Sequence, residues 1–209
     1  MSLYEYIFRI VVIGDCSVGK TAFTNRLTEG YFSKNYEGTI GVDYGSTIIN
    51  IHNHIPIKCQ LWDTAGQETF APLITTYYKD VAGIIMVFDI SKRRTFEHLD
   101  YWLREIKKNR NSILPVPIVL IGNKTDIQNR VVSHDEAFDF AVQNGLLYQE
   151  TSVKNNTNVD KALNLLCEEI YREKETNPGI KESSFNKKFQ IDGLAEEDNS
   201  YSCGDCNIV

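Results

Sequence analysis

A glycine-rich turn joins the first apolar run of this sequence to its first helical stretch, and it restricts the fold more than any other feature. The run Ile7–Ile13 is rich in β-branched residues and has the length of a buried strand, and residues 21–27 have a helical pattern. The turn between them reads Gly14-Asp15-Cys16-Ser17-Val18-Gly19-Lys20-Thr21. A strand, a glycine turn and a helix in this order aim backbone N–H groups at an anion. We therefore predict that the turn binds phosphate.

The side chains of this turn suit the outer phosphates of a nucleoside triphosphate. Lys20 supplies positive charge and is a predicted catalytic residue, and the Thr21 hydroxyl is a predicted Mg²⁺ ligand. Nucleotide contacts are predicted for Cys16, Ser17, Val18, Gly19, Lys20 and Thr21. The alternative is an ordinary turn with incidental glycines, which the flanking strand and helix disfavour. The turn by itself does not distinguish kinases, ATPases and GTPases.

Apolar runs and helical stretches alternate along the rest of the sequence. Period-two runs at Tyr44–Ile51 and Ile55–Trp62 flank a short turn around Asn53 and predict an antiparallel hairpin. Further buried strands are predicted at 82–88, 118–122 and 147–151, and helices at 96–109, 135–144 and 159–175. This alternation predicts an α/β fold, with a mostly parallel sheet covered by helices on both faces. Ligands of such sheets bind beyond the carboxyl ends of the strands, so we expect the functional residues there.

The strand that ends at Trp62 is followed by residues that fit a magnesium ion and a γ-phosphate. The string is Asp63-Thr64-Ala65-Gly66-Gln67. The carboxylate of Asp63 can hold the shell of Mg²⁺, and Gly66 can bring its backbone N–H close to a phosphate because it has no Cβ. Gln67 is predicted to orient the attacking water and is the second predicted catalytic residue. A tight turn would explain Gly66 but not the whole string.

Two later strand ends carry residues suited to a guanine base. The loops read Asn123-Lys124-Thr125-Asp126 and Thr151-Ser152-Val153-Lys154. The carboxylate of Asp126 can accept hydrogen bonds from N1–H and the exocyclic amine of guanine, whereas adenine presents an acceptor at N1. The second loop can close over the base with a backbone N–H. Base contacts are predicted for Asn123, Lys124, Asp126, Ser152, Val153 and Lys154. Each loop is a weak signal alone, but four motifs after four different strands converge on one site.

With these motifs in this order, residues 5–175 resemble the Ras superfamily of small GTPases, and within it the Rab family. The strings that carry the Rab resemblance are Thr39-Ile40-Gly41-Val42-Asp43-Tyr44, Leu61-Trp62-Asp63-Thr64-Ala65-Gly66-Gln67-Glu68, Tyr77-Tyr78 and Val87-Phe88-Asp89-Ile90-Ser91. The resemblance implies a P-loop nucleotide-binding fold with a six-stranded sheet, one strand of which is antiparallel. It also implies two switch segments, near 32–45 and 65–80.

The resemblance assigns roles to aromatic and hydroxyl residues of the switches. Thr39 would bind Mg²⁺ and meet the γ-phosphate in the GTP state, Phe32 would pack against guanine, and Tyr36 would cover the phosphates. An aromatic cluster between the switches would be read by effectors; it comprises Tyr44, Trp62 and Tyr77. The alternative for Trp62 is a plain core residue.

The resemblance also implies a function: a monomeric switch that hydrolyses GTP to GDP and regulates vesicle trafficking by recruiting effectors in the GTP state. Implied partners are an exchange factor, an activating protein, a GDP dissociation inhibitor, effectors and a membrane, but no nucleic acid. Neither switch contains a clear catalytic arginine, and Arg93 and Arg94 lie away from the motifs, so the activating protein is expected to supply one. Cys16 stands where relatives commonly have Ser or Gly, which predicts slower hydrolysis. A hydrolysis-deficient effector-binding module on membranes is therefore the alternative, while Asp126 opposes an ATP-dependent kinase.

Composition excludes other classes and divides the chain. The 209 residues carry 22 basic and 28 acidic side chains and a net charge of −6, which disfavours a protein that mainly coats nucleic acid. Cys16, Cys59 and Cys167 stand singly, which predicts neither a disulfide framework nor a zinc site. Residues 1–175 are predicted to form the small GTPase domain. Residues 176–209 have few apolar groups and are predicted to form a disordered tail.

The end of the sequence suits lipid attachment. No apolar run approaches the roughly 18 residues of a membrane helix. Cys206 stands four residues from the end and fits a prenylation site, although Asn207 and Val209 are atypical there. Cys203 is the candidate for a second lipid, because the acidic tail offers no polybasic signal. A pair of free thiols is the alternative. Prenylation would place the protein on the cytoplasmic face of intracellular membranes, with a cytosolic pool.

Two smaller predictions concern helices. Ser133, with Glu136 three residues later, predicts a capping box at a helix start. His98 and His134 are predicted to be surface residues on helices.

Overall fold

The structure is a computed structural model, and it describes residues 4–33, 39, 41–52, 54–64, 81–109, 116–176 and, for the backbone, 185–187. The strands are β1 (Tyr6–Ile13), β2 (Val42–Ile51), β3 (Ile55–Thr64), β4 (Gly83–Asp89), β5 (Ile118–Asn123), β6 (Leu147–Thr151) and β7 (Phe185–Lys187). The helices are α1 (Lys20–Glu29), α3 (Arg93–Glu97), α4 (Leu99–Asn109), α5 (His134–Asn144) and α6 (Val159–Thr176). Every strand expected from the sequence is present, and so is every helix, except that the helix expected at 96–109 is divided at His98 into α3 and α4.

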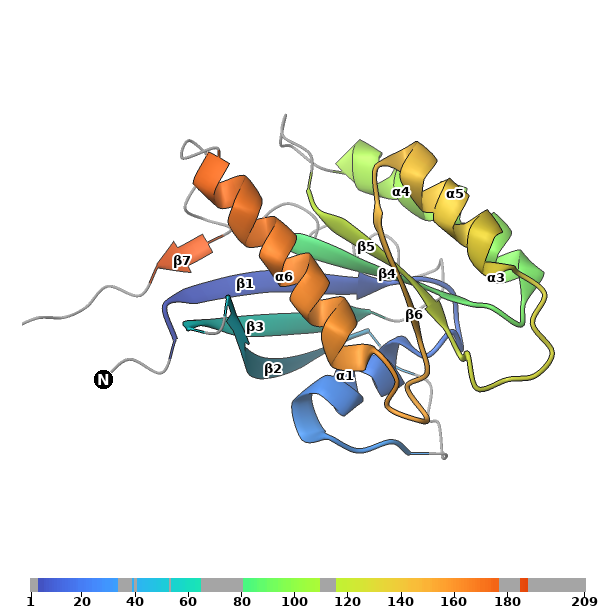
Figure 1. The fold of residues 1–209 in the computed structure, drawn as a ribbon, viewed down its shortest axis with the longest axis horizontal. Coiled ribbons are helices and arrows are strands. Elements are labelled where there is room, and N and C mark those ends of the chain that lie inside the picture. Colours follow the sequence, from blue (N-terminus) through green and yellow to red (C-terminus); the bar gives the residue numbers. More distant parts are fainter. Residues whose placement is uncertain are drawn as a thin grey trace, which may run out of the picture.

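Six strands form one continuous path in the order β2-β3-β1-β4-β5-β6 (Figure 1). β1 pairs in parallel with β3 and β4, and β5 pairs in parallel with β4 and β6, whereas β2 is antiparallel to β3. This confirms the predicted α/β fold with one antiparallel strand. The five parallel strands bring their carboxyl ends to the same edge of the sheet, which is where the predicted motifs begin.

A seventh strand lies where the sequence predicted no regular structure. The backbone of Phe185–Lys187 pairs antiparallel with Tyr6–Phe8 of β1. Among the described residues, β4 pairs with the second half of β1, Ile10–Ile13, which leaves the first half of β1 available to β7 on that side. Strand pairing needs only backbone N–H and C=O groups, and a segment without apolar periodicity can supply them.

Helices cover both faces of the sheet, and each face has its own hydrophobic core. α1 and α6 pack on one face, and α3, α4 and α5 group on the other (Figure 1). β1 supplies both cores, because Ile10 and Val12 face α1 and α6 while Val11 and Ile13 face the other helices. None of the described helices combines the length and apolar character needed to cross a bilayer.

Two cysteines that are far apart in the sequence meet in the first core. Cys59 of β3 and Cys167 of α6 are buried free thiols with their sulfur atoms 3.5 Å apart. Burial raises the pKa of the Cys167 thiol, and the contact with Cys59 adds to the effect. Both cysteines therefore act as small apolar groups in this core.

The predicted capping box forms at the start of α5, and Glu136 has a further partner on α3. The Ser133 hydroxyl accepts a hydrogen bond from the Glu136 N–H at 3.1 Å. The Glu136 carboxylate binds both terminal nitrogens of Arg93, on α3, and Arg93 also donates to the Val131 carbonyl. The Arg93 bonds, and after them the bond from the Ser133 backbone N–H, lower the pKa of Glu136. Arg93 thus links α3 to α5.

Candidate functional site

The turn between β1 and α1 has the geometry that its glycines predict. Gly14 has φ +135°, and a Cβ there would lie 2.2 Å from the Val87 carbonyl oxygen of β4. Gly19 has φ +102°, and a Cβ there would lie 2.4 Å from Nδ2 of Asn123. Side chains are excluded at both positions. The turn therefore packs directly against the ends of β4 and β5.

Lys20 begins α1 and is buried beneath the turn. Its Nζ donates to the carbonyl oxygens of Gly14 at 2.9 Å and Asp15 at 2.8 Å. Burial lowers the pKa of Lys20, and the charge of Asp63 opposes that shift. The residue before the helix, Gly19, makes no side-chain cap, so no side chain at that position occupies the first N–H groups of α1. Such a helix start is suited to an anion.

The three predicted magnesium ligands come together although they are far apart in the sequence. Oγ1 of Thr21 lies 2.5 Å from Oδ2 of Asp63 and 2.6 Å from Oγ1 of Thr39. Oγ1 of Thr39 is 3.5 Å from the same carboxylate oxygen. α1 positions Thr21 and β3 positions Asp63, so the two ligands belong to rigid elements. Hydroxyl and carboxylate oxygens are the donors that Mg²⁺ prefers.

The Asp63 carboxylate indicates whether a cation fits between these three residues. Its Oδ1 is buried and has no hydrogen-bond partner among the described residues. Burial raises the pKa of Asp63 to about 6, against the lowering effect of the Thr21 bond and the Lys20 charge. A divalent cation would supply the missing partner and favour the ionised carboxylate. The donor set therefore fits Mg²⁺.

Asn123 joins the base loops to the phosphate turn. The side chain is 2% exposed, and its Nδ2 donates to the Val18 carbonyl at 2.8 Å. Its Oδ1 accepts from the Thr151 hydroxyl at 3.1 Å and from the Val153 N–H at 3.4 Å. All three contacts are with the protein, so Asn123 acts as a brace between three loops. The Val153 N–H, a candidate to close over the base, is directed at this brace.

Lys124 reaches back to the phosphate turn as well. It has φ +72°, and its Nζ donates to the Ser17 carbonyl at 2.6 Å and lies 2.7 Å from Oδ2 of Asp89. Burial opposes ionisation of Asp89, but bonds from Lys124 and Ser91 outweigh it and lower the pKa. Our sequence reasoning assigned Asp89 no role. An acidic residue at the end of a wholly apolar strand was the signal available.

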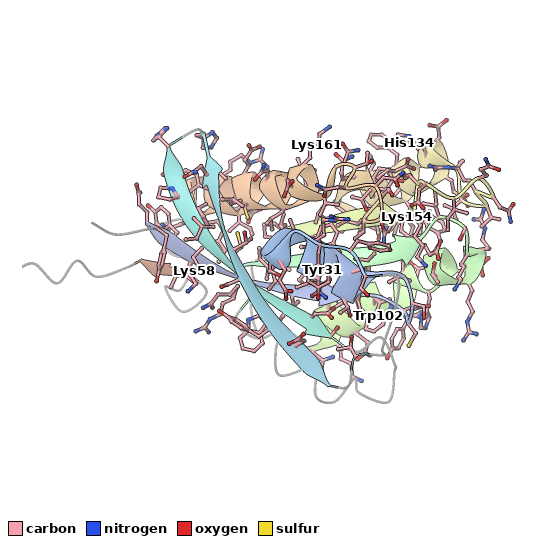
Figure 2. The ribbon with its side chains drawn as sticks, turned by 90° about the horizontal axis from the view of Figure 1, so that it is seen from below. Tyr31, Lys58, Trp102, His134, Lys154 and Lys161 are labelled. Atoms are coloured by element: carbon pink, nitrogen blue, oxygen red, sulfur yellow. The ribbon has the colours of Figure 1, made fainter. Side chains whose placement is uncertain are left out.

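The loop after β6 orients the carboxylate of Asp126. Its Oδ1 accepts from the Ser152 hydroxyl at 2.7 Å, and Nζ of Lys154 lies 3.4 Å from its Oδ2. Burial opposes ionisation, but these two contacts outweigh it, so the pKa of Asp126 is lowered. Arg26 of α1, which our sequence reasoning missed, donates to the Val153 and Lys154 carbonyls. Figure 2 shows Lys154 at the end of the sheet where these loops lie, and Lys58 toward the opposite end.

Comparisons with known proteins identify the family of this chain. Residues 9–172 match the Ras family. The Ras-related protein Rab-2B of Dictyostelium discoideum is 43% identical over 178 residues, which cover 85% of this chain and 87% of that protein. The chain belongs to the Rab family of small GTPases. It is therefore a GTP-binding GTPase of the kind that acts in vesicle trafficking, as the sequence motifs indicated.

Several predicted positions of this Rab-family chain lie outside the described residues. They are Tyr36, Gly66, Gln67, Tyr77, Cys203 and Cys206. Of the remaining predicted contacts, Cys16 is exposed, Val18 is buried, and Phe32 is half-buried against the core beneath α1 and α6. Tyr44 and Trp62 meet edge to face, with ring centroids 5.1 Å apart.

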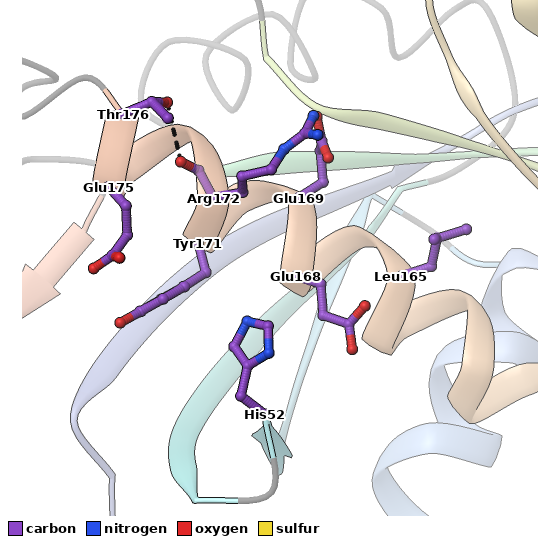
Figure 3. Close-up of a pocket in the computed structure, with 8 residues that line it drawn as sticks. All are labelled: His52, Leu165, Glu168, Glu169, Tyr171, Arg172, Glu175 and Thr176. Atoms are coloured by element: carbon purple, nitrogen blue, oxygen red, sulfur yellow. Dashed lines mark hydrogen bonds and ion pairs between the residues drawn. The ribbon is translucent and has the colours of Figure 1, made fainter.

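A hollow elsewhere on this small GTPase is separate from the predicted site. It measures about 520 Å³ and lies between the β2–β3 turn and α6 (Figure 3). His52 from the turn faces Glu168 and Tyr171 from the helix across it. None of its lining residues belongs to the phosphate, magnesium or base sets. The candidate functional site is therefore the set of polar groups at the strand ends, and this hollow is not part of it.

One prediction about the helices needs correction. His98 is 29% exposed and lies between α3 and α4, but it is not a free surface residue. Its Nδ1 is 2.6 Å from Oδ1 of Asp15, in the phosphate turn. The two residues are 83 positions apart, and no spacing rule connects them.

Proposed function

We propose that this Rab-family protein is a molecular switch that binds GTP with Mg²⁺, hydrolyses GTP to GDP, and recruits effectors in the GTP state. One observation carries the proposal: a lysine-bearing anion turn, an oxygen-rich cation set and a guanine-reading carboxylate converge at one edge of the sheet. The base loop and the phosphate turn stabilise each other, because Asn123 and Lys124 of the base loop bond to the turn.

The phosphate half supplies charge and position. Lys20 and the N–H groups of the turn balance the negative charge that develops on the outer phosphates. Thr21, Thr39 and Asp63 would hold Mg²⁺, which when bound neutralises charge on the phosphate oxygens. Gln67 holds the attacking water in line, and the Gly66 N–H contacts the γ-phosphate.

The base half supplies specificity. The Asp126 carboxylate accepts from N1–H and the exocyclic amine of guanine, while Ser152 and Lys154 hold it ionised. Against adenine the same carboxylate would face an acceptor without a proton, which costs binding. The ligand is therefore GTP or GDP.

Hydrolysis changes the surface that partners read. Loss of the γ-phosphate removes its contacts to Thr39 and Gly66 and releases both switch segments. An exchange factor, an activating protein that supplies an arginine, a GDP dissociation inhibitor and effectors complete the cycle. Prenyl groups on Cys206 and Cys203 attach the chain to intracellular membranes, because stable anchoring takes two signals.

Cys16 favours a second candidate, a GTP-bound module that barely hydrolyses. The Cys16 side chain is exposed in the phosphate turn, where it can crowd the attacking water or the arginine of an activating protein. Single-turnover hydrolysis of radiolabelled GTP, with and without an activating protein, separates the two candidates. The switch predicts slow release of phosphate that the activating protein accelerates. If no phosphate is released in either condition, the hydrolysing switch is overturned in favour of the GTP-bound module. A separate competition experiment tests the base: displacement of bound GDP by excess ATP would overturn the assignment of guanine.

A further inference from the structure

The Asp15 side chain connects the phosphate turn to the junction of α3 and α4. Asp15 places an acidic group inside a turn suited to anions, and its side chain is only 14% exposed. Its Oδ1 lies 2.6 Å from Nδ1 of His98 and 2.9 Å from Nε1 of Trp102. Because a carboxylate only accepts, both ring nitrogens act as donors to this single oxygen.

The two donors are themselves fixed. The His98 ring stacks on Tyr101, with centroids 4.7 Å apart and planes 5° apart. Trp102 is 1% exposed in the core beneath α4, and its indole N–H can only donate. The His98 carbonyl also accepts the N–H of Tyr101 at 3.1 Å as α4 begins. The junction therefore presents two rigid donors toward the turn.

The backbone of the same residue holds the catalytic lysine. The Asp15 carbonyl accepts from Nζ of Lys20 at 2.8 Å, and Lys20 is itself buried. A change in the backbone dihedral angles of Asp15 that pulled its side chain away from these donors would move this carbonyl too. The anchoring of the side chain and the orientation of Lys20 thus depend on one residue.

Charge gives the anchoring a second effect. A carboxylate that turned toward bound phosphates would repel them, most strongly where water is excluded. Two donors on Oδ1 spread part of the carboxylate charge and draw the group toward α3 and α4. The same contacts therefore favour phosphate binding and a fixed lysine.

We propose that His98 and Trp102 are positioning residues that act through Asp15 to fix the phosphate turn and Lys20. Both side chains bond Asp15, whose backbone carbonyl in turn bonds Lys20. The inference rests on the proposed binding and hydrolysis of GTP, and it adds the α3–α4 junction to the parts of the protein on which that reaction depends.

The test uses the full chain and variants that remove one donor while keeping a ring. His98→Phe keeps the stack on Tyr101, and Trp102→Phe keeps a buried aromatic. Release of a fluorescent GDP analogue should accelerate, and single-turnover hydrolysis of GTP should slow, each by about tenfold, because small misplacements of catalytic groups have effects of this size. His98→Asn retains a donor near the Nδ1 position and should restore most of both rates.

Two controls separate positioning from general destabilisation. His134→Phe alters a histidine on α5 that stacks on Phe138, and it should leave both rates at the wild-type value. In an Asp15→Ala background, His98→Phe should have no further effect, because its bonding partner is gone. Thermal unfolding of each variant reports whether the fold is intact, and if Trp102→Phe fails to fold, the half-exposed His98 decides alone.

Wild-type rates in folded His98→Phe would overturn the inference, as would an undiminished His98→Phe effect in the Asp15→Ala background. Either result leaves the proposed function standing, provided that the wild type binds GDP and GTP. A wild-type protein that binds neither nucleotide overturns the proposed function and this inference together.

Discussion

The two halves of the site are built differently, and two aspartates make the contrast plain. Asp126, in the base half, has a partner on each carboxylate oxygen, and its pKa is lowered. Asp63, in the phosphate half, has an Oδ1 without a hydrogen-bond partner among the described residues, and its pKa is raised to about 6, chiefly by burial. Both lie beyond or at the end of a strand.

This contrast distinguishes the part of the site whose polar groups already have protein partners from the part that needs a ligand. In the base half, Asn123, Lys124 and Asp126 all have protein partners among the described residues. In the phosphate half, a buried carboxylate oxygen is left for a cation. We infer that the protein preassembles the base half, whereas Mg²⁺ and nucleotide complete the phosphate half. Because a preassembled site needs little reordering on binding, guanine selectivity should be insensitive to magnesium.

The largest effect is expected from Asp126→Asn, which breaks the base half directly. The amide loses the charge and offers a donor where guanine also donates, so GDP affinity should fall by about 1,000-fold, the combined loss of two bonds to a charged group. Competition between GDP and ATP for the variant measures it. Asp135→Asn, on the exposed face of α5, is the matched control and should bind like the wild type. Retained selectivity in Asp126→Asn would contradict the role of the carboxylate.

Asn123→Ala should destabilise the nucleotide-free protein, because the bonds of Asn123 are formed without a ligand. Its loss leaves the Val18 carbonyl and the Thr151 hydroxyl without their partner, at a cost of about 3 kcal/mol in the free energy of unfolding. Urea unfolding of the nucleotide-free protein measures this. The control is Asn144→Ala, whose exposed side chain donates to the Phe140 carbonyl at the end of α5. Equal stability of the two variants would remove the distinction between the halves.

Thr21→Ala should weaken the phosphate half alone. The variant removes one oxygen from the cation set, so the gain in GDP affinity on adding Mg²⁺ should shrink by about tenfold, as for other changes near metal sites. GDP affinity in excess chelator should stay close to that of the wild type. Thr28→Ala, about two turns further along α1, controls for loss of a threonine from the helix. A similar loss with and without magnesium would argue against a cation at this position.

The smallest effect concerns an ion pair that supports the base loops. Burial opposes ionisation of Glu150, but bonds from Arg130 and Tyr148 outweigh it and lower its pKa below 4.5. A lowered pKa stabilises the fold above the ordinary value, and this contribution is lost as the pH falls through the folded pKa. Glu150→Gln should therefore cost about 0.5 kcal/mol at pH 7, and the difference from the wild type should vanish below the folded pKa. Urea unfolding at several pH values measures it, and a difference that grows on acidification would contradict the assignment.

Sequence reasoning found the parts of the site that a strict spacing defines. The string from Gly14 to Thr21 and the loop from Asn123 to Asp126 follow predicted strands, so their meeting at one edge followed from the parallel sheet. Thr39 required the resemblance to a family, because no local pattern marks it as a partner of Thr21.

Contacts set by packing could not be predicted in this way. The bonds from His98 to Asp15 and from Arg26 to Val153 join elements whose relative placement depends on the whole core. Glu136 matched a local motif, yet it also bonds Arg93 of another helix, which the motif does not predict. β7 has no apolar signature, because its pairing with β1 uses the backbone. In each case a tertiary contact decides what local sequence leaves open.

Amide hydrogen exchange in the nucleotide-free protein and in its complex with Mg²⁺ and GDP tests the central claim most directly. Backbone bonds already hold the amides of Thr125, Ser152 and Thr157, so their protection should be nearly the same in both states. The first amides of α1, which lack a side-chain cap, should gain protection on binding. Equal gains in both sets, or gains confined to the base loops, would contradict a preassembled base half and a phosphate half completed by its ligands.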